Sequence, residues 1–248
     1  MRVAVISDIH ANLPALESVL AEIDGTDVEE IWCLGDVVGY GAQPDECTVA
    51  TRERSDFCLV GNHDLAVLGD LDISSFSASA AEAVTWTRRE AEEESIEFLR
   101  GLEPEGEREG IGLFHASPRD PVWEYVLSIE QAEECMQVQS QRVALIGHSH
   151  VALFFARDDS AAAGHGPAKG AQAPAGATLD LSSGTWLINP GSVGQPRDGD
   201  PRAAWLELDT DEWTARFHRL PYEIDRAARP IIEAGLPRHL GERLYTGQ

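Results

Sequence analysis

Lysine is nearly absent from this sequence, and basic residues as a whole are few. Of the 19 basic side chains among 248 residues, only Lys169 is a lysine, and 43 acidic residues give a formal net charge of −24. Such a surface repels nucleic acid and anionic membranes at long range. A nucleic acid polymer is therefore a disfavoured partner. A GC-rich genome or a salty cytoplasm is the simplest explanation of the composition.

Cysteine and long apolar segments are also scarce. No apolar run approaches the ~20 residues that a membrane span needs, and the N-terminal MRVAVISDIHAN lacks the pattern of a signal peptide. No CxxC pair is present, and buried, reduced thiols are the expected state. We therefore expect a cytoplasmic protein without a membrane partner. The cysteines are Cys33, Cys47, Cys58 and Cys135.

Apolar, β-branched runs recur along the chain and alternate with helical patterns. The early runs, such as RVAVIS, EEIWCLG and RVALIGH, are continuous, as in strands of a sheet that is buried on both faces. A helical period is found in residues 13–24, 44–54, 78–102 and 128–139. This alternation predicts an α/β protein built from βαβ units with right-handed crossovers.

Two later stretches depart from this alternation. Residues 158–180 are rich in Ala, Gly and Pro, which predicts a flexible surface loop between two antiparallel strands, with a solvated His165 inside it. Residues 222–246 have the pattern of short helices packed on the outside of the protein. No internal repeat or boundary is evident, so we expect residues 1–248 to form a single domain.

Several of the apolar runs end directly in Asp, Asn or His. In parallel α/β sheets, sites form beyond the carboxyl ends of the strands, so residues far apart in sequence can converge there. Asp8 and His10 are two positions apart, as are His148 and His150, and in an extended segment residues at this spacing point to the same side. The residues that follow these runs are Asp8, His10, Asp36, Asn62, His63, His115, His148 and His150.

These side chains supply nitrogen and oxygen donors but no sulfur. Such a set suits Mn or Fe best, with Zn, Ni or Co as alternatives, and fits Ca or Cu(I) poorly. Seven ligands exceed what one ion needs, whereas two ions that share a carboxylate would use them. Two metals ~3.5–4 Å apart clamp the attacking and leaving oxygens of a phosphoryl displacement. Each motif alone is weak evidence, but the ordered set is hard to attribute to chance.

In this order the motifs resemble those of the calcineurin-like metallophosphoesterases. That family has DxH, GD, GNH followed by an acid, an isolated His, and GHxH. The corresponding residues here are Asp8-Ile9-His10, Gly35-Asp36, Gly61-Asn62-His63-Asp64, His115 and Gly147-His148-Ser149-His150. The segment NPGSVGQPR, residues 189–197, is similar to the small bacterial and archaeal phosphodiesterase branch. The resemblance implies a four-layer α/β/β/α sandwich of two facing mixed sheets flanked by helices.

The resemblance also implies a role for each residue. The first metal would be held by Asp8, His10 and His150, the second by Asn62, His115 and His148, and Asp36 would bridge the two. A water activated between the metals would be the in-line nucleophile. His63 would contact a phosphate oxygen or protonate the leaving group, which imidazole can do near neutral pH. Asp64 would either orient the His63 turn or simply cap it.

One departure from the family bears on the substrate. The serine/threonine protein phosphatases carry GDxxDRG at the second motif, whereas this chain reads GDVVGYG from Gly35 to Gly41. The acid that partners the catalytic His and the Arg that grips phosphate are therefore missing. Replacement anion contacts could come from Arg119, Arg197 or Arg202. Tyr40 and Tyr125 could line the pocket or simply pack at its rim.

These observations predict a dinuclear metal-dependent phosphoesterase acting on a small phosphodiester or phosphomonoester. In this reading His63 and Asp36 are catalytic, and Asn62, Arg119 and Arg197 contact the substrate. The alternatives are a protein phosphatase or a nuclease of the same superfamily, or a non-catalytic protein-binding scaffold. The scaffold is disfavoured because a scaffold member, a retromer subunit, lacks the equivalent of His63, which this chain keeps. Homo-oligomerisation is left open.

Overall fold

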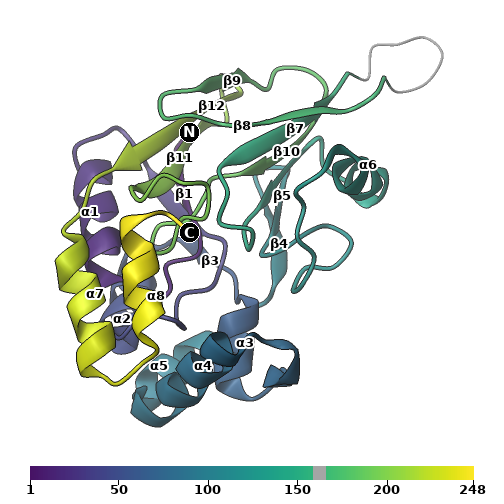
Figure 1. Cartoon of the computed structure of the whole chain (residues 1–248). Helices are drawn as coiled ribbons and strands as arrows, with labels where there is room; N and C mark the ends of the chain where they lie inside the picture. The colour runs from purple at the N-terminus through teal and green to yellow at the C-terminus, as the bar shows by residue number, and fades with distance from the viewer. Residues whose placement is uncertain (159–165) are drawn as a thin grey trace.

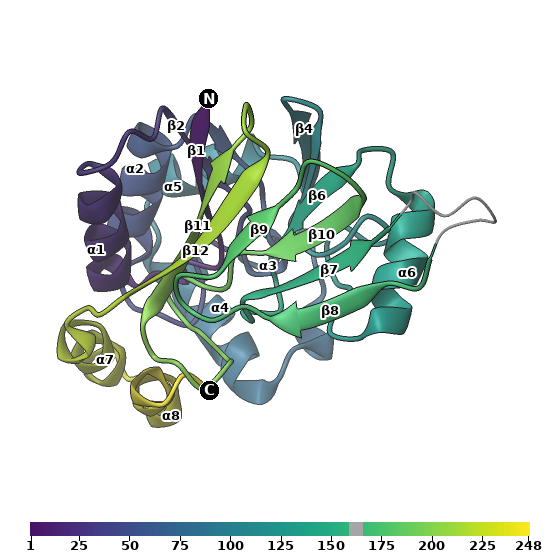
Figure 2. The ribbon, with the colours of Figure 1, turned by 90° about the horizontal axis from the view of Figure 1, so that it is seen from above.

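The computed structural model describes residues 1–158 and 166–248, whose strands form two six-stranded sheets packed face to face (Figures 1 and 2). The first sheet has the order β3 (Phe57–Cys58), β2 (Glu30–Cys33), β1 (Arg2–Ile6), β11 (Ala203–Asp209), β12 (Thr214–Leu220), β9 (Thr178–Asp180). The second has the order β4 (Glu105–Arg108), β5 (Ile111–Phe114), β6 (Val143–Ile146), β10 (Thr185–Asn189), β7 (Leu153–Arg157), β8 (Lys169–Gln172). The expected sandwich of two mixed sheets flanked by helices is confirmed.

Each sheet contains a block of parallel strands. In the first sheet β1 pairs in parallel with β2, and β2 with β3. In the second, β6 pairs in parallel with both β5 and β10. Parallel neighbours share one direction, so their carboxyl ends lie at one edge of the sheet. Five of these six strands, β1, β2, β3, β5 and β6, are followed by candidate ligand residues, and the packing of the two sheets brings these segments to a common edge.

Alternation along the strands divides the core into layers. Val3 and Val5 of β1 pack between the sheets against Leu113 and Leu145 of the second sheet. Ile6, on the opposite face of β1, packs outward with the helices. This period of two is what a strand buried on both faces requires. The cysteines are all free, with Cys33, Cys47 and Cys135 buried and Cys58 half-buried.

Helices cover the outer faces of both sheets (Figure 2). α1 (Leu13–Ile23) begins where the Asn12 side chain accepts a hydrogen bond from the backbone of Ala15, and it packs on β11. α2 (Pro44–Arg54) and α7 (Ile224–Glu233) flank it, and α6 (Ile129–Val138) covers the second sheet. The remaining helices are α3 (Asn62–Leu68), α4 (Ala78–Glu90), α5 (Glu93–Arg100) and α8 (Arg238–Glu242), with 3₁₀ turns η1 (Ile73–Ser75) and η2 (Arg243–Tyr245). None of these helices is long and apolar enough to cross a bilayer.

The stretch expected to be one helix over residues 78–102 is two helices, α4 and α5. The chain becomes extended at Ala91 and Glu92. The Asp45 carboxylate accepts hydrogen bonds from the backbone N–H of Glu92 and from the hydroxyl of Ser95. A side chain that is distant in sequence therefore stabilises the start of α5 and separates it from α4.

The loop expected over residues 158–180 is only partly correct. β8 pairs antiparallel with β7, and β9 pairs antiparallel with β12. All four residues of β8 are exposed, so its backbone bonds fix the strand without leaving an apolar pattern in the sequence. His165 lies outside the described residues. The helices α7 and α8 lie where residues 222–246 were expected to be helical.

Candidate functional site

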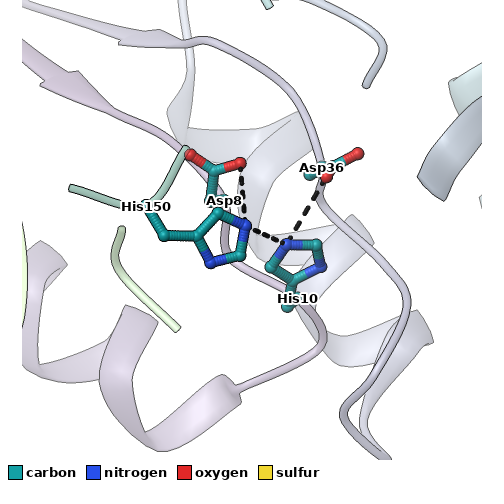
Figure 3. A group of neighbouring side chains, drawn as sticks. All are labelled: Asp8, His10, Asp36 and His150. Carbon is teal, nitrogen blue, oxygen red and sulfur yellow. Dashed lines mark hydrogen bonds and ion pairs between the residues drawn. The ribbon is translucent and has the colours of Figure 1, made fainter. Parts of the chain in front are cut away.

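The edge shared by the two sheets holds two groups of side chains that could bind metal ions. In the first group the ligand atoms of Asp8, His10, Asp36 and His150 lie within 4.8 Å of one another, and these side chains point toward a common centre (Figure 3). In the second group Asp36 joins His115 and His148. All of these residues are buried. Asp36 is thus common to both groups, as expected of a bridging ligand.

Each histidine of the two groups has one ring nitrogen against a backbone carbonyl. An N–H donated to the carbonyl fixes the tautomer and leaves the other nitrogen unprotonated, which is the usual arrangement of metal-binding histidine. The pairs are His10 Nδ1 with Val38 O at 3.1 Å, His115 Nδ1 with Leu34 O at 2.8 Å, His148 Nε2 with Trp123 O at 3.1 Å and His150 Nδ1 with Gln195 O at 2.6 Å.

The atoms left facing the centre are all acceptors. The Nε2 atoms of His10 and His150 lie 3.1 Å apart, with their lone pairs toward each other when both Nδ1 atoms carry the proton. Oδ2 of Asp36 lies 3.4 Å from Nε2 of His10 and is buried without a hydrogen-bond partner. A buried polar atom without a partner is costly. A cation between these atoms would satisfy all of them, so the residues fit a metal site.

Asn62 and His115 meet in the second group. Oδ1 of Asn62 lies 3.1 Å from Nε2 of His115, and that nitrogen lies 3.7 Å from Oδ2 of Asp36. Asn62 is the first residue of α3, directly after Gly61. A Cβ at Gly61 would lie 2.0 Å from Oδ1 of Asp36, so only glycine leaves room for the carboxylate. An uncharged amide oxygen is therefore available as an additional ligand to a second ion.

The ligand-bearing turns have an unusual backbone. The φ angles are 55° at Asp8, 51° at His10, 55° at Asp36, 63° at His148 and 58° at His150, all in the left-handed region. Each such residue costs on the order of 1–3 kcal/mol, which is typical of functional sites. The sequence-based expectation of extended i, i+2 pairs was therefore wrong. The paired ligands converge because the chain turns sharply after each strand.

Burial controls the charge of the site. It raises the pKa of Asp8 to about 7, and burial together with Asp64 raises the pKa of Asp36 well above its ordinary value. Burial lowers the pKa of His10, His148 and His150 well below the ordinary value. In the metal-free cluster the imidazoles of His10, His148 and His150 are therefore neutral, and the carboxyl groups of Asp8 and Asp36 tend to hold protons near neutral pH. A bound cation would displace those protons.

His63 lies beside the ligands and does not belong to either group. Its backbone N–H donates to Oδ1 of Asp36 at 2.8 Å, and its ring lies 4.9 Å from that of His10. Nδ1 of His63 is buried without a hydrogen-bond partner, and a Cβ at Gly39 would lie 2.6 Å from it. The motif GDVVGYG thus leaves no place for the acid that partners this histidine in the protein phosphatases.

Asp64 organises the turn and does not contact His63 through a hydrogen bond in the described structure. Its carboxylate accepts hydrogen bonds from the backbone N–H groups of Val37, Val38 and Gly61 at 3.2, 3.0 and 2.9 Å. It therefore ties the turn after β2 to the start of α3. These two turns carry Asp36 and Asn62, so Asp64 helps to hold both ligands in place.

A pocket of about 380 Å³ opens beside the cluster. Its lining includes Asn62, His63, Tyr40, Phe76, Trp123, Tyr125, Arg197 and Arg243. The Tyr125 ring stacks on that of His148 with centroids 4.1 Å apart, and Arg197 Nη2 donates to the Tyr40 hydroxyl at 3.3 Å. Tyr40, Tyr125 and Arg197 were expected near the site. Phe76, Trp123 and Arg243 were not, because no motif surrounds them.

The other two candidate arginines are engaged elsewhere. Arg119 pairs with Glu124 at 3.2 Å and also with Glu134, and it does not line this pocket. Arg202 pairs with Asp200 at 2.6 Å. A pocket of about 480 Å³ between α7 and α8 is lined by none of the candidate ligands. The pocket beside His63 is therefore the candidate substrate site.

Comparison with known proteins agrees with this geometry. An uncharacterized protein of Methanocaldococcus jannaschii is 35% identical, over 99% of this chain and 98% of that protein. The crystal structure of a metallophosphoesterase from Sphaerobacter thermophilus is 38% identical and superposes with a TM-score of 0.88, over 100% of this chain and 99% of that one.

A hypothetical protein from Pyrococcus horikoshii shares the fold, with 20% identity and a TM-score of 0.78 over 100% of this chain and 98% of that one. Residues 1–211 match the sequence profile of the calcineurin-like phosphoesterase superfamily domain. With the ligand cluster lying inside that range, the resemblance seen in the motifs is confirmed: this chain belongs to the calcineurin-like phosphoesterase superfamily, a family of metal-dependent phosphoesterases.

Proposed function

We propose that this protein is a dinuclear metal-dependent phosphoesterase that hydrolyses a small phosphodiester, with phosphomonoesters as weaker substrates. The observation that carries the proposal is Oδ2 of Asp36, which is buried, has no hydrogen-bond partner and belongs to both ligand groups. A single ion would leave the second group without a function. The proposed ligands are Asp8, His10 and His150 for one ion, Asn62, His115 and His148 for the other, and Asp36 for both.

The donor set also supports particular metals. Imidazole nitrogens and carboxylate or amide oxygens without sulfur favour Mn or Fe, with Zn, Ni or Co as alternatives. When bound, two such ions would supply positive charge to the phosphoryl oxygens and lower the pKa of a water for in-line attack. A cytoplasmic location, in keeping with the free cysteines, belongs to the same proposal.

His63 serves the leaving-group side of the reaction in this proposal. It lines the substrate pocket, and burial and the charge of Arg197 lower its pKa well below the ordinary value. An anionic phosphate entering the pocket raises that pKa again, because negative charge nearby favours the imidazolium. His63 would then hydrogen-bond a phosphate oxygen and deliver a proton to the departing alkoxide.

The size and charge of the site favour a small ester. A pocket of about 380 Å³ is in the range that holds a small molecule. The net charge of −24 disfavours the approach of long polyanions, although at physiological salt this repulsion is weak beyond a Debye length of ~8 Å. A small diester carries little charge, so it is hardly repelled by the protein, and it is small enough for the pocket.

Metal analysis combined with a substrate panel tests the proposal. Protein loaded with saturating Mn²⁺ and desalted should contain close to two equivalents of metal. It should hydrolyse bis-p-nitrophenyl phosphate faster than p-nitrophenyl phosphate, and chelation should abolish both activities. A stoichiometry that saturates at one equivalent would rule out the dinuclear site. If kcat/KM on long single-stranded DNA or on a phosphoserine peptide exceeded that on every small diester tested, the small-diester assignment would be wrong, and a nuclease or a protein phosphatase would take its place.

A further inference from the structure

Arg243 reaches the substrate pocket from the C-terminal segment of the chain. It lies in η2, beyond the residues 1–211 that match the family, and lines the pocket together with Arg197. The two guanidinium groups lie near the same ring, with Cζ of Arg197 5.7 Å and Cζ of Arg243 5.4 Å from the ring centroid of Tyr40. Two positive charges thus line one pocket and approach the same tyrosine ring in a protein that is strongly acidic.

Within residues 1–158 and 166–248, neither of these arginines forms an ion pair with an Asp or Glu side chain. Arg197 donates to the hydroxyls of Tyr40 and Tyr125 and to the amide oxygen of Gln195, and its buried Nε has no partner. Nε of Arg243 donates to the main-chain oxygen of Gln248. By contrast, the arginines whose side chains pair with carboxylates include Arg52, Arg54, Arg108, Arg119, Arg202, Arg219 and Arg238.

Because no Asp or Glu side chain among the described residues pairs with either arginine, an external anion can complete the pair. Burial and the neighbouring Arg197 lower the pKa of Arg243, so the charge of Arg243 is disfavoured when the pocket is empty. A phosphate group accepts several N–H bonds from guanidinium forks and relieves this repulsion. Acidic side chains are abundant in this chain, yet none in the described part of the structure forms an ion pair with Arg197 or Arg243, so both guanidinium groups can pair with a ligand.

The arginine pair lies next to the metal ligands and not among them. The Tyr40 ring, which both guanidinium groups approach, lies 4.8 Å from the His10 ring and 4.3 Å from the His63 ring. The scissile diester carries one negative charge, which two metal ions would more than neutralise. A second anionic group is needed to match two further cations.

We propose that Arg197 and Arg243 form a subsite for a second phosphate group of the substrate, separate from the phosphate that is hydrolysed. The substrate is then a small phosphodiester that carries an additional phosphate. This inference rests on the proposed function for the scissile phosphate. The phosphate subsite itself can be tested without any hydrolysis.

Binding of inorganic phosphate to the chelated protein tests the subsite directly. Without metal, the ligand cluster offers buried acceptors and the arginine pair offers donors, so phosphate should bind at the pair. Arg243→Gln should weaken this binding at least about tenfold, the usual effect of losing a charged hydrogen-bond donor. Arg238→Gln is the matched control, because Arg238 is exposed on neighbouring α8 and pairs with Glu242. Equal phosphate affinity in the wild type and Arg243→Gln would overturn the proposal.

Kinetics on two matched esters tests the substrate class. Thymidine 5′-(p-nitrophenyl phosphate) carries one phosphate, and its 3′-phosphorylated form carries a second. The wild type should prefer the 3′-phosphorylated ester, and Arg243→Gln should reduce this preference about tenfold while retaining its melting temperature. A purely structural role for Arg243 would lower kcat/KM equally on both esters, and that result would overturn the inference. If neither ester were hydrolysed, the proposed function would fail, while the phosphate titration would still decide the subsite.

Discussion

The ligand cluster and the wall of the neighbouring pocket are built in different ways. The cluster residues follow closely on sheet strands, and parallel pairing within each sheet, together with the packing of the two sheets, brings those strand ends to one edge. The wall is assembled from loops and the C-terminal turns, and its members meet through side-chain contacts such as Phe76 against Trp123, with ring centroids 5.1 Å apart. The sheets thus position the candidate metal ligands, whereas the shape of the candidate substrate pocket depends on how the outer segments pack.

Asp36→Asn should have the largest effect, because it removes charge from the one carboxylate that belongs to both ligand groups. We expect both metals to bind much more weakly and activity to fall by at least the ~10²–10⁴-fold that removal of a single acid–base group causes. Metal stoichiometry and kcat on bis-p-nitrophenyl phosphate measure this. An Asp36→Asn protein that still held two ions at wild-type affinity would contradict the bridging assignment.

His63 lines the pocket beside the ligand cluster, and His63→Gln tests whether it acts on the substrate and not as a metal ligand. The variant should keep both metals, since His63 belongs to neither ligand group, while kcat falls ~10²–10⁴-fold on esters with poor leaving groups. The loss should be smaller for p-nitrophenyl esters, whose leaving group needs little protonation. An equal loss on p-nitrophenyl and alkyl esters would remove the proton-donor role and leave only an electrostatic one.

The sequence predicts the cluster well for a physical reason. Apolar runs that end in Asp, Asn or His limit which residues can meet once the strands pair, so the approach of Asp8, Asp36 and His148 to one another could be predicted without coordinates. The left-handed turns at these residues could not be foreseen, because they depend on backbone contacts made across the edge, such as the N–H of Asp8 to the carbonyl of Gly35 at 3.0 Å.

The wall was largely hidden from the sequence. Arg243 gains its position from the packing of α8 on α7, which no local pattern encodes. The break between α4 and α5 depends on the side chain of Asp45, and β8 is fixed by backbone pairing alone. The common cause is that these features arise from contacts between segments that are far apart in sequence.

Metal affinity should fall as the pH is lowered below about 7. The pKa of Asp8 is raised to about 7 in the metal-free protein, so below this pH a proton must leave before a cation can bind. The histidine ligands with lowered pKa values are already neutral and add no such cost. The proton on Asp8 alone predicts about a tenfold loss of Mn²⁺ affinity per pH unit between pH 7 and 5, and the raised pKa of Asp36 can only make this loss larger. Calorimetric titrations that gave a constant affinity over this range, with the fold intact by circular dichroism, would contradict it.

Gly61→Ala tests whether the cluster can be weakened without changing any ligand. The added Cβ would lie 2.0 Å from Oδ1 of Asp36 and must displace that carboxylate. Misplacing a ligand through its support typically costs ~10–100-fold in metal affinity. Gly101→Ala is a suitable control, because its nearest contact would be 3.5 Å away at the end of α5. Similar Mn²⁺ affinities in the two variants would show that the close fit at Gly61 is unimportant.

Arg119→Ala should have the smallest effect. Compared with a change at Arg197, it tests which arginine belongs to the pocket wall. The sequence offers Arg119 and Arg197 equally as phosphate contacts, but only Arg197 lines the pocket, while Arg119 is paired with Glu124 and Glu134. Its side chain is 37% exposed, so losing these ion pairs should change the free energy of unfolding by no more than about 1 kcal/mol.

We expect kcat/KM of Arg119→Ala to match the wild type, and that of Arg197→Gln to fall at least about tenfold, since the charge of Arg197 faces the pocket. Urea unfolding and steady-state kinetics of both variants measure this. Equal kinetic losses would mean that the loop carrying Arg119 moves onto the substrate, and the wall would then extend beyond the residues that line the pocket in this structure.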